Sequence, residues 1–82
     1  MSLALRYALA VPRSLEQPSQ RLERELRQRL AAGEWEPGEV MPTLATLASA
    51  YGTSRETAGR VVKKLADDGL VIVKARWGIF RA

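Results

Sequence analysis

The sequence predicts a mostly α-helical domain that ends in a small β-hairpin. Three observations indicate this fold class. Three segments carry apolar residues at every third or fourth position, a glycine follows each segment, and a β-branched run lies near the C-terminus. The glycines are Gly33, Gly52 and Gly69, and the run covers residues 70–73. A helix, a short strand, two helices and a hairpin, in that order, form a winged helix-turn-helix.

The length and composition predict one domain without enzymatic chemistry. Eighty-two residues, 46% hydrophobic and 27% charged, suit a single globular domain with a modest core. Cysteine and histidine are both absent, which excludes disulfides, thiol nucleophiles, histidine bases and the usual zinc or haem ligand sets. No cluster of acid, base and nucleophile is visible. We therefore expect no catalytic activity and no cofactor.

The location expected from the sequence is the cytoplasm. No apolar run approaches the 18 or more residues that a membrane span needs. The first eleven residues lack the basic start and the cleavage pattern of a secretion signal. A reducing compartment is compatible with the absence of cysteine.

Basic charge is concentrated in the C-terminal part of the chain. The net charge is +4, yet residues 1–49 hold six basic and six acidic side chains and cancel. Residues 50–82 hold seven basic and three acidic side chains, and seven minus three accounts for the whole excess. An excess confined to the part that holds the last helix and the hairpin indicates a polyanionic partner.

The N-terminal segment is apolar, and its structure stays open at this stage. Residues 3–11 are apolar at every second position, as in a half-buried strand, but the alanines between them suit a helix equally well. Such a segment is expected to pack on the domain, on a partner subunit or on something outside this chain. Pro12 ends it. We therefore divide the chain into an apolar segment with its connection, residues 1–17, and a domain, residues 18–82.

The domain begins with the clearest helix, predicted over residues 20–32 with Pro18 or Ser19 near its start. Leu22, Leu26 and Leu30 form its buried stripe. The pair Pro37-Gly38 fits the centre of a type II turn, and Trp35 beside it is expected to fold onto the core rather than to stack on a ligand. Residues 40–42 are predicted to form a short edge strand before Thr43 caps the next helix.

Residues 44–65 predict two helices joined by a tight turn. Leu44, Leu47, Ala48 and Tyr51 share one stripe, Gly52 ends the first helix, and the second starts near Arg55. The buried stripe of the second helix is formed by Ala58, Val61, Val62 and Leu65. In a helix-turn-helix the second helix, here about residues 54–67, lies in the DNA major groove. A helical hairpin with a solvated basic face is the alternative.

The last elements are predicted to form the wing. Residues 70–73 read as a strand, residues 75–78 as a hairpin tip, and residues 79–81 as the returning strand with Phe80 facing inward. Lys74, Arg76 and Trp77 lie where the wing, about residues 74–78, would reach phosphates or the minor groove.

Residues 22–80 resemble the DNA-binding domain of the GntR family of bacterial transcription regulators. The landmarks are the Pro37-Gly38 turn, Met41-Pro42-Thr43 (similar to the family's Leu-Pro-Ser), Leu47-Ala48, residues 51–55, Leu65, the acidic pair before Gly69-Leu70, and Gly78-Ile79-Phe80 (similar to its Gly-Thr-Phe). The resemblance implies a winged helix that binds double-stranded DNA, acts as a repressor at a palindromic operator, and forms a homodimer.

The family's DNA contacts carry over in part. Ser54, Arg55 and Thr57 match the start of its recognition helix, and Arg60 falls at an often charged position. Ala45 and Gly59 stand where the family commonly has arginine, and Arg76-Trp77-Gly78 replaces its Gly-x-Gly. Glycine at position 59 costs about 1 kcal/mol in a helix relative to alanine. Its presence has two explanations: close approach of the helix backbone to DNA or to another helix, or tolerated drift. The residues expected to contact DNA are Thr43, Ser54, Arg55, Glu56, Thr57, Arg60, Lys63, Lys74, Arg76 and Trp77.

Members of the family typically join this domain to a larger C-terminal domain that binds an effector and forms the dimer. This chain stops just after the predicted wing, so we expect either an excised domain or a stand-alone DNA binder, with no effector site in the chain. In the second case residues 3–11 could supply dimer contacts. A winged helix that binds an acidic protein partner, or a non-specific architectural DNA binder, are the alternatives.

Overall fold

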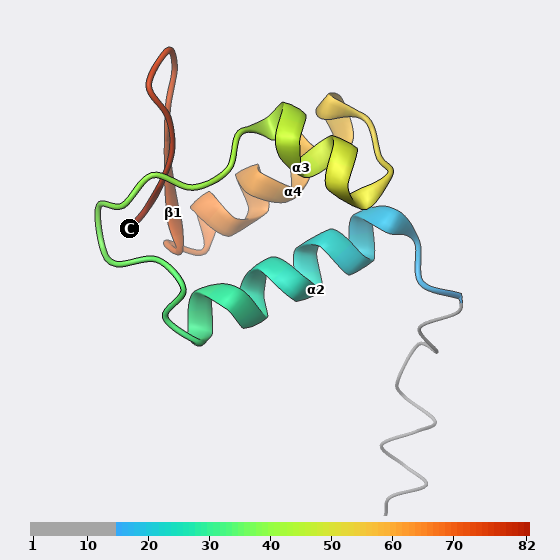
Figure 1. Ribbon diagram of the computed structural model, residues 1–82, viewed down its shortest axis with the longest axis horizontal. Helices are drawn as coiled ribbons and strands as arrows, with labels where there is room; N and C mark the ends of the chain where they lie inside the picture. Colours follow the sequence, from blue (N-terminus) through green and yellow to red (C-terminus); the bar gives the residue numbers. More distant parts are fainter. Residues whose placement is uncertain (1–14) are drawn as a thin grey trace, which may run out of the picture.

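The computed structural model describes residues 15–82. The predicted apolar segment, residues 3–11, lies outside the described residues, and so does most of the predicted N-terminal part, residues 1–17. Three helices, α2 (Pro18–Ala31), α3 (Leu44–Tyr51) and α4 (Arg55–Asp67), are followed by the antiparallel strands β1 (Val71–Lys74) and β2 (Gly78–Arg81). The three helices lie against one another, and the hairpin projects beside them (Figure 1). The predicted winged helix-turn-helix is confirmed.

Helix α2 begins at Pro18, which confirms the prediction of Pro18 or Ser19 near its start. Pro18 is its first residue, where the missing N–H removes no helical hydrogen bond, and the backbone N–H of Gln17 donates to Gln20 Oε1 at 2.8 Å. Leu22, Leu26 and Leu30 are buried as the periodicity predicts. Beyond the helix, Gly33 takes a left-handed φ of +78°, so that Glu34 N–H can donate to the Arg29 carbonyl.

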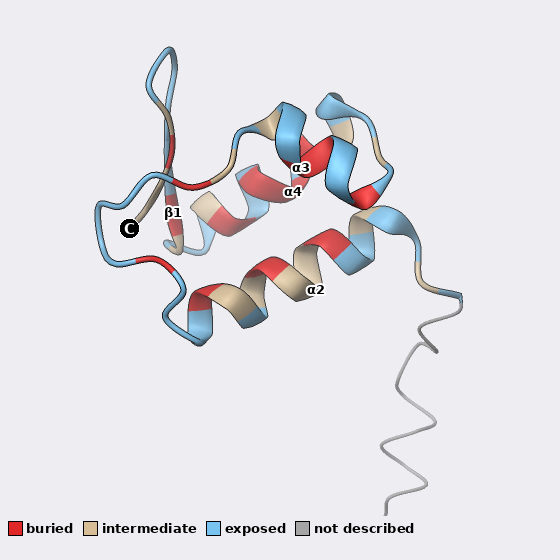
Figure 2. Cartoon of the chain, in the orientation of Figure 1, coloured by how far each residue is buried: buried red, intermediate tan, exposed pale blue. Residues whose placement is uncertain are grey.

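Helices α3 and α4 are capped by hydroxyls and packed through their apolar stripes. Thr43 Oγ1 accepts from Thr46 N–H at 3.1 Å, and Ser54 Oγ accepts from Thr57 N–H at 3.0 Å. The buried residues of the two helices face α2 and each other (Figure 2). These buried side chains are Leu47, Ala48, Tyr51, Ala58, Val61, Val62 and Leu65. Within residues 15–82, no helix is long and apolar enough to cross a membrane.

The connection between α2 and α3 closes the core at the hairpin end. Trp35 is buried, as predicted, and the guanidinium of Arg29 lies 4.7 Å from the centre of its ring. The type II turn is confirmed, because Glu39 N–H donates to the Glu36 carbonyl at 2.9 Å and Gly38 has a φ of +86°. The edge strand predicted over residues 40–42 is reduced to a single β-bridge between Val40 and Phe80.

The hairpin corrects one prediction. Ile79, and not Phe80, points into the core: Ile79 is 3% exposed, like Val71 of β1, while Phe80 is only partly buried. Phe80 pairs with Ile72 across the hairpin and with Val40 on its other side, on the outer face. Side chains alternate between the two faces of a strand, and paired residues share a face. Because β1 turns the face with Val71 towards α4, Ile79 of β2 is inward and Phe80 is outward.

Candidate nucleic-acid interface

Five of the ten predicted contact residues meet at one hollow between the start of α3, the start of α4 and the hairpin. These five are Thr43, Arg55, Lys74, Arg76 and Trp77. The hollow has a volume of about 400 Å³, and Leu44, Ala45, Val73, Gly78 and Ile79 complete its lining. No acidic residue lines it. The fold therefore brings together side chains that are up to 34 positions apart in the sequence, between residues 43 and 77.

In the described part of the chain, the three cations that line this hollow have no carboxylate partner. Within residues 15–82, Arg55, Lys74 and Arg76 form no ion pair with a carboxylate, whereas Arg60, Lys63 and Lys64 each lie within 3.5 Å of one. A cation without a carboxylate partner can neutralise a phosphate without first losing an ion pair. The hollow therefore gathers three cations, each of which can accept an anion without first losing an ion pair.

The tip of the hairpin is an exposed aromatic next to a strained arginine. Trp77 is 75% exposed, and its backbone N–H donates to the Lys74 carbonyl at 3.0 Å. Arg76 has a φ of +76°, the only positive φ of a non-glycine residue in the described part of the chain. A left-handed conformation costs a residue with a Cβ about 1–2 kcal/mol, so the turn holds Arg76 against its backbone preference.

The outermost stripe of α4 carries two ion pairs of the i, i+4 kind. Arg60 lies 3.5 Å from Glu56, and Lys63 lies 3.5 Å from Asp67, with all four side chains between 66% and 82% exposed. Such pairs contribute about 0.3–0.5 kcal/mol and break readily. The stripe therefore offers both donors and acceptors to a partner, at the position farthest from the core.

The other flank of α4 meets the N-terminal half of α2 in a groove that sequence reasoning did not predict. Thr57 and Arg60, two predicted contact residues, line it together with Ser19 and Gln20 of α2 and Lys64 of α4. The side chain of Lys64 lies 3.4 Å from Glu23 of α2. No sequence signal could have identified this flank, because it is formed by helices about 40 positions apart.

The remaining predicted residue, Ser54, is occupied as a cap. Its hydroxyl accepts from Thr57 N–H and donates to Thr57 Oγ1 at 2.9 Å. The structure therefore divides the other nine predicted residues between the hollow at the hairpin, the outer stripe of α4 and the groove beside α2.

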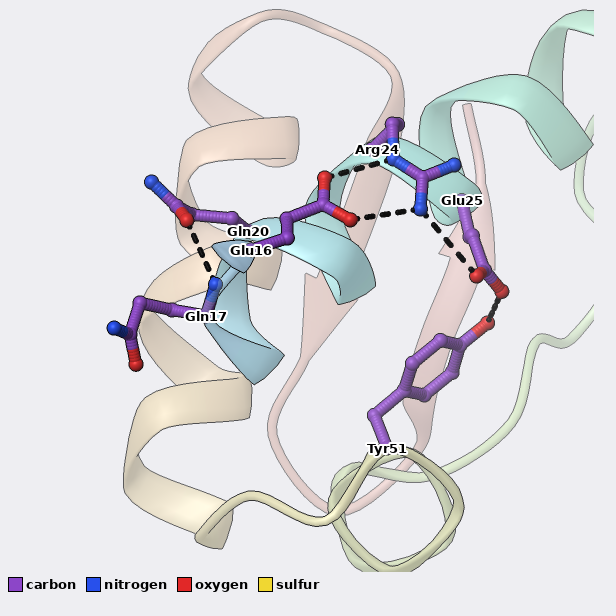
Figure 3. Close-up of polar contacts among 6 residues, drawn as sticks. All are labelled: Glu16, Gln17, Gln20, Arg24, Glu25 and Tyr51. Atoms are coloured by element: carbon purple, nitrogen blue, oxygen red, sulfur yellow. Dashed lines mark hydrogen bonds and ion pairs between the residues drawn. The ribbon is translucent and has the colours of Figure 1, made fainter. Parts of the chain in front are cut away.

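A polar cluster fixes the helix-turn-helix on α2. Tyr51, at the end of α3, donates its hydroxyl to Glu25 Oε1 at 3.0 Å (Figure 3). Arg24 of α2 lies between carboxylates, with two hydrogen bonds of 2.8 and 2.9 Å to Glu16 and an ion pair of 3.7 Å to Glu25. The hydrogen bonds to Glu16 raise the pKa of Arg24 above its ordinary value. The cluster holds α3, and with it the turn before α4, in one orientation.

A second set of ion pairs fixes the end of α4. Arg27 of α2 donates to Asp68 Oδ2 at 2.6 Å and to Glu23 Oε2 at 3.1 Å, and these two hydrogen bonds raise the pKa of the guanidinium. Helix α4 is therefore tethered to α2 at its C-terminal end. Among residues 15–82, no three side chains of the metal-binding types come together.

Comparison with solved structures supports the fold. The chain superposes on the DNA-binding domain of AraR, solved in complex with the operator ORX1, with a TM-score of 0.78 and 22% identity over 88% of this chain and 87% of that one. At this level of identity the likeness shows the shared fold.

Curated relatives match in sequence. The uncharacterized HTH-type transcriptional regulator YieP of Escherichia coli is 37% identical over 57 residues, which are 70% of this chain and 25% of that protein. The histidine utilization repressor of Klebsiella aerogenes is 31% identical over 72 residues, 87% of this chain and 30% of that protein. The chain thus spans between a quarter and a third of the length of these relatives.

The model of the bacterial regulatory proteins of the gntR family matches residues 18–80, which cover all the described helices and nearly the whole hairpin. This family is one of bacterial regulatory proteins, and the two relatives are named a transcriptional regulator and a repressor. The chain belongs to the GntR family of bacterial regulatory proteins.

Proposed function

We propose that this chain binds double-stranded DNA sequence-specifically, as the DNA-binding part of a GntR-family transcription regulator. In this proposal α4 enters the major groove, and the hairpin at residues 74–78 contacts the backbone or the minor groove. The observation that carries it is the hollow at the start of α4, which is lined by three cations without carboxylate partners and by no acid. Phosphates are the anions that this arrangement fits best.

The proposed division of labour follows from the geometry. Arg55, Lys74 and Arg76 contact phosphates from both sides of the hollow, and Thr43 supports them from the start of α3. Trp77 reaches the minor groove or a sugar from the hairpin tip. Glu56 and Arg60 face the base edges from the outer stripe of α4. The remaining proposed contacts to the backbone come from Ser54, Thr57 and Lys63.

We further propose that the protein acts as a repressor by occupying an operator. One relative is named a repressor, and one structural neighbour was solved on an operator. Two copies would place their recognition helices one helical turn of DNA apart, about 34–36 Å, on a palindromic site. We take residues 18–82 as the DNA-binding unit, and the bacterial cytoplasm as its location. Whether residues 3–11 supply the dimer contacts stays a prediction.

The experiment that tests the proposal is an anisotropy titration of the chain with a random duplex pool across a salt series, followed by sequencing of the bound fraction. We expect a log-log slope of about −4 or steeper, since each neutralised phosphate contributes about −0.9, and an enriched palindromic motif. Arg55→Ala should make the slope shallower by about 0.9. Arg29→Gln removes the same charge from the far end of α2, where Arg29 contacts Trp35, and should leave the slope unchanged.

Each contrary result has its own meaning. Unchanged affinity and motif in Arg55→Ala would refute the assignment of α4 as the recognition helix. Salt-sensitive binding without an enriched motif would indicate a non-specific architectural protein. Absence of binding near physiological salt would refute DNA binding.

A protein-interaction module is the second candidate, and one observation favours it. The outer face of the hairpin and its neighbour expose two apolar side chains beside Phe80: Val40 is 57% exposed and Ile72 45%. Exposed apolar residues that lie together mark contact sites for proteins. Binding of an acidic protein without binding of duplex DNA would favour this candidate.

A further inference from the structure

The outer stripe of α4 contains an acid in the first turn, where the helix dipole favours negative charge but the phosphates of bound DNA would repel it. Glu56 is in the first turn of α4, and its side chain is 82% exposed. The pair that Glu56 forms with Arg60, 3.5 Å away, is exposed and contributes little, so interaction with the helix dipole is the structural role of this acid in the free protein. The base edges of the major groove do offer it a partner, because the N4 amino group of cytosine is a hydrogen-bond donor there.

Few other side chains compete for that position. In the first turn, Arg55 lines the hollow at the hairpin, and Thr57 is hydrogen-bonded to Ser54. In the second turn, Ala58 and Val61 are buried and Gly59 has no side chain. Glu56 and Arg60 are therefore the outward side chains of the N-terminal half of α4, the half that contacts base edges in helix-turn-helix proteins, and Arg60 also borders the groove beside α2.

The two side chains together match one base pair. In a C·G pair, cytosine N4 and guanine O6 are hydrogen-bonded to each other, so they are about 2.9 Å apart. In the major groove N4 keeps one free N–H, while guanine O6 and N7 accept. Glu56 can accept from N4 while Arg60 donates to O6 and N7, with the two side chains about as far apart as in the free protein, 3.5 Å.

We propose that Glu56 and Arg60 jointly read a C·G base pair in each half-site of the operator. The proposal rests on the proposed function, since it requires α4 to lie in the major groove. It adds the identity of one base pair and makes Glu56, the acidic residue of the pair, the determinant of the cytosine.

The test compares motifs selected from random duplexes by the wild type, Glu56→Ala and Glu56→Gln. The wild type should require a C·G pair at one position of each half-site. Glu56→Ala should reduce the preference at that position about 5- to 100-fold, as expected for one good base contact, and should strengthen binding to random duplex because a negative charge is lost. Glu56→Gln should move the preference from cytosine towards adenine, whose N6 and N7 a glutamine amide contacts in a bidentate manner.

Asp67→Asn is the matched control. Asp67 lies on the same stripe and pairs with Lys63 at the same distance of 3.5 Å, but in the last turn of α4. It should change affinity without changing the motif. An unchanged motif in both Glu56 variants, with a wild type that does select a motif, would overturn the C·G proposal and leave the proposed function standing. A wild type that selects no motif would overturn both.

Discussion

Replacing Gly59 by alanine should stabilise the domain. Gly59 lies inside α4 with ordinary helical backbone angles, so its backbone freedom is not needed by the native structure. An added Cβ would lie 3.7 Å from Leu44 Cδ1, an ordinary contact distance, and no other atom is closer. Alanine is favoured over glycine in a helix by about 1 kcal/mol. For a domain of this size, that corresponds to a rise in Tm of about 4–8 °C.

The same substitution distinguishes the two accounts of Gly59. No other helix of the described residues approaches Gly59 closely enough to require glycine, since the nearest atom is a flexible side-chain methyl. Close approach of α4 to DNA is the account that remains besides tolerated drift. If the DNA backbone or a base approaches at Gly59, Gly59→Ala will raise Tm and weaken duplex binding. If the glycine is drift, Tm will rise and binding will not change.

Thermal unfolding followed by circular dichroism, together with anisotropy titration of the selected duplex, measures both quantities. A drop in Tm would refute the reasoning, because it would mean that the site does not accept a methyl group beside Leu44. Ala58→Gly is the matched control, because it makes the opposite substitution at the adjacent, buried position of the same helix. It should lower the Tm.

Two further predictions concern the hairpin and the end of α2. Arg76→Gly should relieve the positive φ of 76°, worth about 1–2 kcal/mol, at a cost of about 0.5–1 kcal/mol for the greater backbone freedom that glycine loses on folding. The free energy of unfolding should therefore rise by about 0.5–1 kcal/mol, while the slope of log affinity against log salt becomes shallower by about 0.9. A lower Tm, or an unchanged slope, would contradict it. The second prediction is a pH dependence, because the hydrogen bonds from Arg29 lower the pKa of Glu34 below its ordinary value of 4.5. Because the pKa of Glu34 is lower in the folded state, its ion pair adds stability at pH values above the pKa of the unfolded state. This stability is lost as the pH falls through the pKa of the folded state. Glu34→Gln should therefore have a lower Tm than the wild type at neutral pH, and the difference should vanish in acid; a difference that persists in acid would mean that the pair is not its cause.

The three helices could be predicted from the sequence because the forces that define them are local. Leu22, Leu26 and Leu30 recur with the helical period, and Thr43 and Ser54 cap the helices from adjacent positions. The Pro37-Gly38 turn depends on the φ preferences of two residues in sequence. For these elements the structure changed only the bounds of α2, from residues 20–32 to Pro18–Ala31.

The hairpin and the interface depended on tertiary packing. Whether Ile79 or Phe80 is inward is decided by the face that the hairpin turns towards α4, and a shift by one residue reverses it. The third strand shrank to one bridge at Val40 because the chain crosses β2 only briefly before α3 begins.

The sequence by itself determined which residue types are present for binding: an excess of basic side chains after residue 49 and the spacing of a helix-turn-helix. Only the tertiary structure decided how they are grouped. It brought Arg55, Lys74 and Arg76 to one hollow and left these three cations without carboxylate partners among the described residues, whereas Arg60 and Lys63 each pair with one. The physical reason is that periodicity and caps act within a few residues, whereas ion pairs and hollows depend on which distant segments pack against each other.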